Sequence, residues 1–120
     1  MRNVIFYATE RDEVPVLEFL NSLDKQTKAK VERFLLLLQE QGEKLHRPYV
    51  DHLRGAIKEL RIRRSADNIR VLFFFFRQSH IVLLHAFRKK SWAVPEADIE
   101  KADHRREDFL IQVQRGELDL

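Results

Sequence analysis

Residues 57–90 read IKELRIRRSADNIRVLFFFFRQSHIVLLHAFRKK, and this stretch decides the fold. Its first part alternates between apolar and polar residues, as a strand with one buried face does. Its middle part is apolar on both faces, which is typical of a central strand. Turn residues separate the segments. The stretch therefore predicts three consecutive strands, Ile57–Arg64, Ile69–Arg77 and Ile81–Lys89.

Helices and one further strand are predicted around this core. Val4 to Tyr7 is short, branched and aromatic, like a strand. Thr9 and Asp12 resemble a capping box before a first short helix that carries Pro15 in its first turn. A second helix is predicted from the cap Asp24 to Gly42, and Pro95 can open a last one. The predicted order is β-α-α-β-β-β-α over one domain, 1–120.

This order favours an α+β fold in which helices cover one side of a curved, mainly antiparallel sheet. The other side is then open to a ligand. It is expected to hold the basic side chains, because Arg61 and Arg63 alternate with the apolar Leu60 and Ile62.

Positive charge is concentrated in this part of the chain. Between Arg54 and Lys90 there are ten Lys or Arg residues and only two acids, although the formal net charge of the whole chain is +3. Such a segregated surplus attracts a polyanion, and a nucleic-acid backbone is a common one. The alternative is that these bases only protect strand edges from aggregation.

Composition excludes several classes of site and protein. The chain has no cysteine, so a disulfide framework, a thiolate nucleophile and a zinc–thiolate site are impossible. His46, Asp51 and His52 do not match a metal-binding motif, and His85 lies in an apolar segment where a hydrogen-bonded core histidine is expected. No signal peptide or membrane-length apolar run is present. A cytoplasmic protein without metal or membrane attachment is expected.

Several short motifs follow one another in an order that resembles the RelE/HigB superfamily of bacterial toxins, in particular its phage-derived HigB-like branch. They are Lys58-Glu59-Leu60-Arg61-Ile62, Ile69-Arg70-Val71-Leu72-Phe73, Leu83-Leu84-His85-Ala86-Phe87-Arg88-Lys89-Lys90, Pro95 and Ile99-Glu100-Lys101-Ala102. The resemblance covers most of the chain and implies a RelE-like fold, with two N-terminal helices packed on one face of the sheet and a C-terminal helix.

The resemblance further implies a toxin of a type II toxin–antitoxin system that cleaves messenger RNA on the 70S ribosome and inhibits translation. Such enzymes use the RNA 2′-hydroxyl as nucleophile, so no metal or other cofactor is expected. The implied partners are a cognate helix-turn-helix antitoxin, messenger RNA on the ribosome and, through the antitoxin alone, operator DNA.

Carried over by motif, the implied catalytic residues are Arg61, Arg70 and Lys89. Arg70 could donate paired hydrogen bonds to phosphate oxygens, or instead form a salt bridge with Glu59. The implied RNA-binding residues are Arg63, Arg64, Arg88, Lys90 and Trp92. Trp92 could stack on a base or anchor the last helix.

Two features keep other functions open. Where relatives often carry tyrosine, this chain has Ile69 and Phe73, so a phenol for stacking or proton transfer is missing there. The same fold serves the ParE branch, which poisons DNA gyrase, and a basic face would also suit a non-catalytic RNA-binding regulator or a protein that receives an acidic partner.

Overall fold

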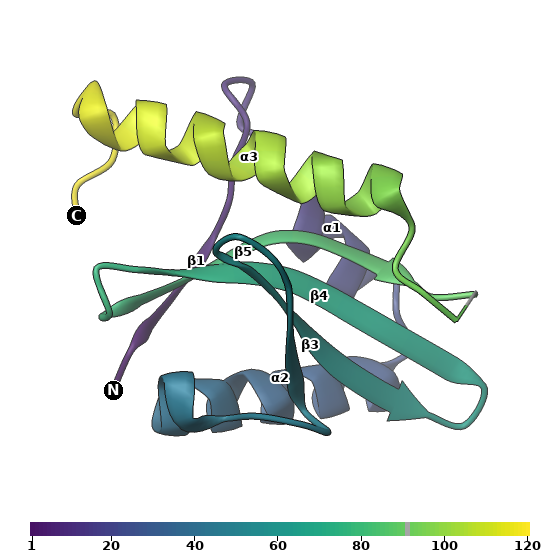
Figure 1. The fold of residues 1–120 in the computed structure, drawn as a ribbon. Helices are drawn as coiled ribbons and strands as arrows, with labels where there is room; N and C mark the ends of the chain where they lie inside the picture. Colours follow the sequence, from purple (N-terminus) through teal and green to yellow (C-terminus); the bar gives the residue numbers. More distant parts are fainter. Residues whose placement is uncertain (91) are drawn as a thin grey trace.

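The computed structural model describes residues 1–90 and 92–120, and it contains one sheet and three α-helices (Figure 1). A short 3₁₀ turn, Gly42–Lys44, follows the second helix. The elements are β1 (Asn3–Phe6), α1 (Pro15–Asn21), α2 (Lys25–Gln41), β2 (Val50–Arg54), β3 (Ile57–Arg64), β4 (Asp67–Phe76), β5 (His80–Arg88) and α3 (Glu96–Gln114).

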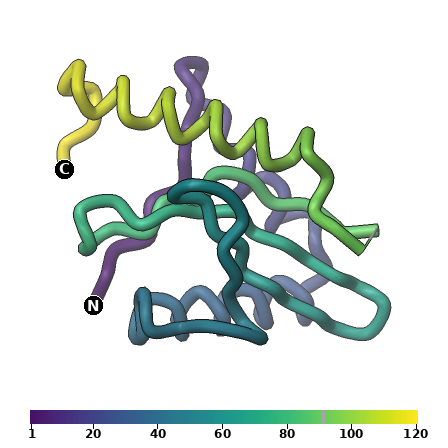
Figure 2. Tube along the Cα trace, in the orientation of Figure 1, coloured from purple at the N-terminus to yellow at the C-terminus, as the bar shows by residue number. Residues whose placement is uncertain are grey.

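The five strands form one sheet in the order β1-β5-β4-β3-β2. All neighbouring strands are antiparallel except β1 and β5, which are parallel. The mixed α+β class and the mainly antiparallel sheet are therefore confirmed, and the tube in Figure 2 shows the three hairpin-connected central strands.

The sequence-based order lacks one strand, β2. This short element contains the polar Asp51 and His52, and its pairing is irregular between His52 and Arg54. Its own residues carry little strand signal. It becomes a strand because it pairs with β3, where Val50 faces Leu60 and Asp51 faces Glu59.

Helices cover both faces of the sheet, which corrects the expectation that they lie on one side. In Figure 1, α2 lies below the sheet and α3 above it. The cause is β4, whose Val71 and Phe73 pack in the core beside α1 and α2 while Leu72 and Phe74 pack in a second core with α3. A strand that is apolar on both faces needs two covers. The β3–β4 hairpin reaches past the amino end of α3, so this end of the sheet is not covered by that helix (Figure 1).

The ends of α2 confirm the predicted capping residues. The Asp24 side chain accepts a hydrogen bond from the Thr27 backbone N–H at 2.7 Å, which satisfies a free donor of the first turn. Gly42 ends the helix with a φ of 57°, a conformation that glycine adopts without steric cost.

The predicted capping box of α1 is wrong, whereas Pro15 lies in the first turn of the helix as predicted. The Thr9 hydroxyl accepts a hydrogen bond from the Glu13 N–H at 3.1 Å, but this bond closes a turn before the helix. The helix begins at Pro15, after Val14. Proline fits this first position because a backbone N–H there has no acceptor within the helix, so proline loses no hydrogen bond by lacking it.

A bulge in β5 sets which face each later side chain of that strand takes. The register with β4 shifts so that Leu72 faces His85 while Phe73 faces Leu83, and Leu84 is left without a partner. Leu84 and His85 consequently both lie on the α3 side of the sheet. Beyond the bulge, alternation puts Lys89 on the α3 side. Without the extra residue, Lys89 would lie on the α1/α2 side.

None of the helices among residues 1–90 and 92–120 combines the length and the apolar character needed to cross a bilayer.

Tyr7, just after β1, connects this edge of the sheet to α3. Its side chain is 5% exposed, and its hydroxyl donates a hydrogen bond to Asp108 Oδ2 at 2.6 Å. Burial, reinforced by the bond to Asp108 and by that carboxylate's charge, raises the pKa of Tyr7 to about 12. The pKa of Tyr7 is therefore higher in the folded state than in the unfolded state. The Tyr7–Asp108 hydrogen bond then contributes fully to stability below the unfolded pKa, and this contribution is lost as the pH rises through the folded pKa.

We therefore expect Tyr7→Phe to lower the free energy of unfolding by about 2 kcal/mol near neutral pH, the typical value of a hydrogen bond to a charged group. The difference between the native protein and the variant should shrink from about pH 10 upward. Urea unfolding of both proteins at several pH values measures it. A difference that stays constant into the alkaline range contradicts this account of Tyr7.

Candidate nucleic-acid interface

Two adjoining hollows meet at the uncovered end of the sheet and share Arg63, Asn68 and Arg70 in their walls. We call the combined surface the basic groove. On the β2 side it continues to Lys30, Phe34, Pro48, Tyr49 and Arg61. On the β5 side it continues to Lys89, Lys90 and Trp92. Six of these side chains are basic, and no acid is among the described residues that line the groove.

The hairpin of β3 and β4 brings the two central arginines together. Arg61 and Arg70 are direct cross-strand partners, and Arg63 faces Asn68 one step further along. Partners of this kind have Cβ atoms only about 5 Å apart and point to the same face of the sheet. The sequence-based expectation that Arg61 and Arg63 share a face with each other is met.

Lys89 joins the arginines from β5. Its backbone N–H donates to the Asn68 carbonyl at 2.7 Å, so the pairing of β5 with β4 continues one residue past Arg88. Together with the bulge at Leu84, this pairing brings the Lys89 side chain to the face that carries Arg70. Of the three residues that the resemblance implies as catalytic, Arg70 thus pairs directly with Arg61 and shares a hollow with Lys89.

A buried carboxylate lies beneath these cations. Glu59 is only 1% exposed, and its side chain accepts a hydrogen bond from Arg61 Nε at 2.6 Å. Its second oxygen lies 3.5 Å from Arg70 Nε. Arg61 also donates to Asp51 at 3.0 Å. The Glu59–Arg70 salt bridge that the sequence suggested as an alternative role of Arg70 is thus present, and it holds Arg70 in position in the groove wall.

The contact between Glu59 and Arg70 is an ion pair without a hydrogen bond. Among the residues that the structure describes, neither Glu59 Oε2 nor Arg70 Nε has a hydrogen-bond partner, although both atoms are buried. The far end of Arg70 is better held, because its Nη1 donates to the Asn68 side chain and, at 3.3 Å, to the Ile69 carbonyl. Buried polar atoms normally have partners, so the ion pair between Arg70 Nε and Glu59 Oε2 is only weakly satisfied.

Burial, together with neighbouring positive charge, lowers two pKa values in the groove. Burial lowers the pKa of Arg70, Glu59 opposes this, and Arg61 and Arg63 lower it further. Burial also lowers the pKa of Lys89, with the neighbouring charges of Arg70 and Arg61 acting in the same direction. A bound phosphate would relieve this repulsion, and a lysine with a lowered pKa gives up its proton more readily.

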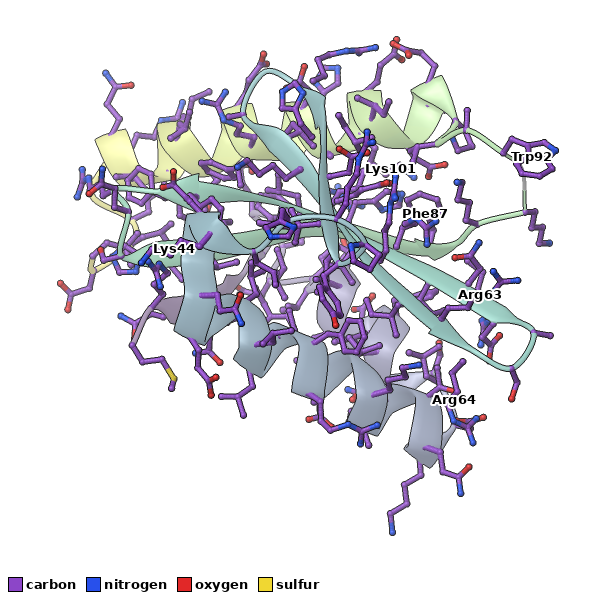
Figure 3. The ribbon with its side chains drawn as sticks, turned by 60° about the horizontal axis from the view of Figure 1, so that its bottom comes forward. Lys44, Arg63, Arg64, Phe87, Trp92 and Lys101 are labelled. Atoms are coloured by element: carbon purple, nitrogen blue, oxygen red, sulfur yellow. The ribbon has the colours of Figure 1, made fainter. Side chains whose placement is uncertain are left out.

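Arg64 and Arg88 lie on the other side of the sheet. Arg64 is directed to the start of α2, where it lies 3.8 Å from Asp24 and donates to Gln26. Arg88 donates to Asp67 at 3.1 Å and lies over the ring of Phe19 in α1. Figure 3 shows Arg64 beside the amino end of α2, apart from Arg63 and Trp92. Neither residue lines the basic groove, and RNA contact by them stays a prediction.

Trp92 is fully exposed, at 101% of its reference area, and lines the β5 end of the groove with Lys90. Figure 3 shows its ring projecting from the loop that follows β5. A side chain this exposed does not pack against α3, so of the two roles suggested by the sequence, the structure favours that of a free aromatic surface.

His85 is a hydrogen-bonded core residue, as its apolar segment predicts. It is buried, its Nε2 lies 2.6 Å from Asp98 Oδ1, and Arg105 donates toward its Nδ1 at 3.3 Å. Burial lowers the pKa of His85 despite the bond to Asp98. Among residues 1–90 and 92–120, no three His, Asp or Glu side chains lie close enough together to hold a metal ion.

The missing tyrosines do not leave a gap in the groove. Ile69 and Phe73 are fully buried in the core beside α2, so a phenol at either position would lie on the far face of the sheet. The groove instead contains Tyr49, which sequence reasoning missed along with Lys30, Phe34, Pro48 and Asn68. These residues carry no motif, and only the path of the chain between α2 and β3 brings Tyr49 to Arg61.

A comparison with protein families found one match, to the phage-derived Gp49-like proteins, over residues 18–107. This range begins in α1, ends in α3 and includes every residue of the basic groove. A comparison with curated proteins found no match. Since the match covers most of its length, the chain belongs to the phage-derived Gp49-like family, which is part of the toxin group of toxin–antitoxin systems.

Proposed function

We propose that this toxin is a metal-independent endoribonuclease that cleaves messenger RNA on the 70S ribosome in the cytoplasm and so inhibits translation. The observation that carries the proposal is the meeting of Arg61, Arg70 and Lys89 in one groove, with Arg61 and Arg70 paired directly across β3 and β4. Cleavage of a phosphodiester needs positive groups where negative charge develops.

The proposed reaction uses the RNA's own 2′-hydroxyl. Its oxygen attacks the adjacent phosphorus, the bond from phosphorus to the 5′-oxygen breaks, and the products end in a 2′,3′-cyclic phosphate and a 5′-hydroxyl. The 2′-proton leaves to a base, and the departing 5′-oxygen takes up a proton. The groove supplies what this chemistry needs most, since a doubly charged phosphorane-like transition state is stabilised by fixed guanidinium groups.

Each of the three residues has a role in this proposal. Arg61 is held by Glu59 and Asp51 and contacts the non-bridging phosphate oxygens from the β2 side. Arg70 contacts them from the wall that the two hollows share. Lys89 is assigned to the 5′-oxygen, because a lowered pKa suits a proton donor.

The remainder of the groove is proposed to bind the single strand. Arg63 and Lys90 are exposed and can contact neighbouring phosphates, whereas Trp92 offers a ring on which a base can stack. Single-strand binding sites commonly combine a positive groove with aromatic side chains in this way.

Membership in a toxin family also implies a cognate antitoxin. We propose that this antitoxin is a helix-turn-helix protein and that the toxin meets operator DNA only through it.

Arg70→Ala and Lys89→Ala should each lower messenger RNA cleavage about 10²- to 10³-fold, the usual effect of removing one group that stabilises the transition state. The measurement is primer extension on messenger RNA in a purified translation system, with and without ribosomes. Arg70→Lys separates chemistry from folding, since it keeps a positive charge beside Glu59 but lacks the planar pair of donors.

The matched control is Arg33→Ala, which removes the same charge from an exposed position of α2 outside the basic groove. It should keep cleavage within a few-fold of the native rate. If the native protein folds but makes no cuts, the ribonuclease proposal fails, and gyrase poisoning or simple RNA binding takes its place.

Trp92→Ala should weaken the binding of single-stranded RNA by about 5- to 150-fold, because stacking of one base on an aromatic ring contributes about 1–3 kcal/mol. Trp92→Phe should recover most of this affinity. Fluorescence anisotropy with a 2′-O-methylated oligonucleotide measures it without cleavage. Equal affinities of the native protein and Trp92→Ala would remove Trp92 from the proposed site.

A further inference from the structure

Tyr49 is an aromatic side chain at the end of the basic groove opposite to Trp92. It is 38% exposed and shares a hollow with Arg61, Arg63 and Lys30. Trp92 lines the adjoining hollow at the other end. The wall common to both hollows contains Arg70, so the proposed phosphate-binding centre lies between two aromatic side chains.

The backbone of Tyr49 is fixed at both of its polar groups. Its N–H donates to the His46 carbonyl at 2.9 Å, and its carbonyl accepts from the Arg61 N–H at 2.8 Å. The second bond joins Tyr49 to the very residue that is proposed to contact the phosphate. The position of Tyr49 relative to Arg61 is therefore set by the start of the β2–β3 pairing.

Phe34 packs against the ring of Tyr49 and orients it. Phe34 of α2 meets it edge to face, with ring centroids 5.5 Å apart and an interplanar angle of 70°. Pro48 precedes it and lines the same hollow. A ring that is held by one neighbour and remains more than a third exposed offers apolar surface to a ligand.

The hollow that contains this ring is also lined by cations. Lys30 lies over the Phe34 ring at 5.7 Å from Nζ to the centroid, and its Nζ also donates to the Arg63 carbonyl. Arg61 and Arg63 complete the hollow. An aromatic ring set among fixed cations matches a flat base attached to a phosphate.

We infer that Tyr49 is a specificity-determining residue that stacks on the nucleobase on one side of the scissile phosphate, while Trp92 takes a base on the other side. This inference rests on the proposed ribonuclease function and deepens it. The nucleotide bound at Tyr49 would be fixed relative to Arg61, so its identity and stacking strength would influence where the RNA is cut.

The test pairs each variant with single abasic positions in the RNA. The probe is a short single-stranded oligonucleotide, 2′-O-methylated to prevent cleavage, and its binding is measured at low salt, where phosphate contacts are strong. An abasic scan of the native complex should show loss of affinity at two separated positions. Tyr49→Leu should weaken binding about 5- to 150-fold and abolish sensitivity at one of these positions, whereas Trp92→Ala should abolish it at the other.

The choice of variants keeps folding apart from binding. Tyr49→Leu retains an apolar side chain against Phe34, and Tyr49→Phe retains the ring and should bind within about twofold of the native protein. Leu36→Ala, at an exposed position of α2 outside the groove, is the matched surface control. Primer extension with Tyr49→Leu should show cut sites redistributed among codons.

Two outcomes separate the failure of this inference from that of the proposed function. If folded Tyr49→Leu binds as the native protein does, with the same abasic profile and the same cut sites, Tyr49 does not contact a base and the inference is overturned, while the ribonuclease proposal stands. If the native protein neither binds nor cuts RNA, both are overturned.

Discussion

The buried carboxylate of Glu59 is the constraint on which the rest of the site depends. A carboxylate that is 1% exposed must be paired, and in this protein its partners are the two arginines of the groove, Arg61 at 2.6 Å and Arg70 at 3.5 Å. Glu59 thereby draws two like charges together on adjacent strands. Both arginines line the groove, and the repulsion that remains between their charges favours an anion there.

Backbone geometry decides which other side chains reach this centre. The direct pairing of Arg61 with Arg70 aligns β3 with β4, and the bulge at Leu84 moves Lys89 to the same face. Helices cover both sides of β4, and the β3–β4 hairpin reaches past the amino end of α3 (Figure 1). Core packing and site geometry are consequently linked, because the strand that fills both cores also carries Arg70 in the groove.

The sequence predicts those parts of the molecule that depend on local pattern. The strands from 57 to 90 and the limits of α2 follow from alternation, an apolar run, a capping aspartate and a terminal glycine, and the structure confirms them. The sequence does not predict β2, which forms because it pairs with β3. It also does not predict that helices cover the second face of the sheet, which follows from packing. The approach of Arg61, Arg70 and Lys89 could be expected from motifs. The presence of Tyr49 in the groove could not be expected, since its position depends on the loop between α2 and β2.

The most direct test of the central claim concerns the chemistry of the cut. A messenger RNA with one 2′-deoxynucleotide immediately 5′ to a mapped cut site should resist cleavage there and remain sensitive at other sites. The cut ends of the unmodified RNA should carry a 2′,3′-cyclic phosphate and a 5′-hydroxyl. Cleavage at the 2′-deoxy position, or products with 5′-phosphate ends, would contradict a groove that works on the RNA's own hydroxyl.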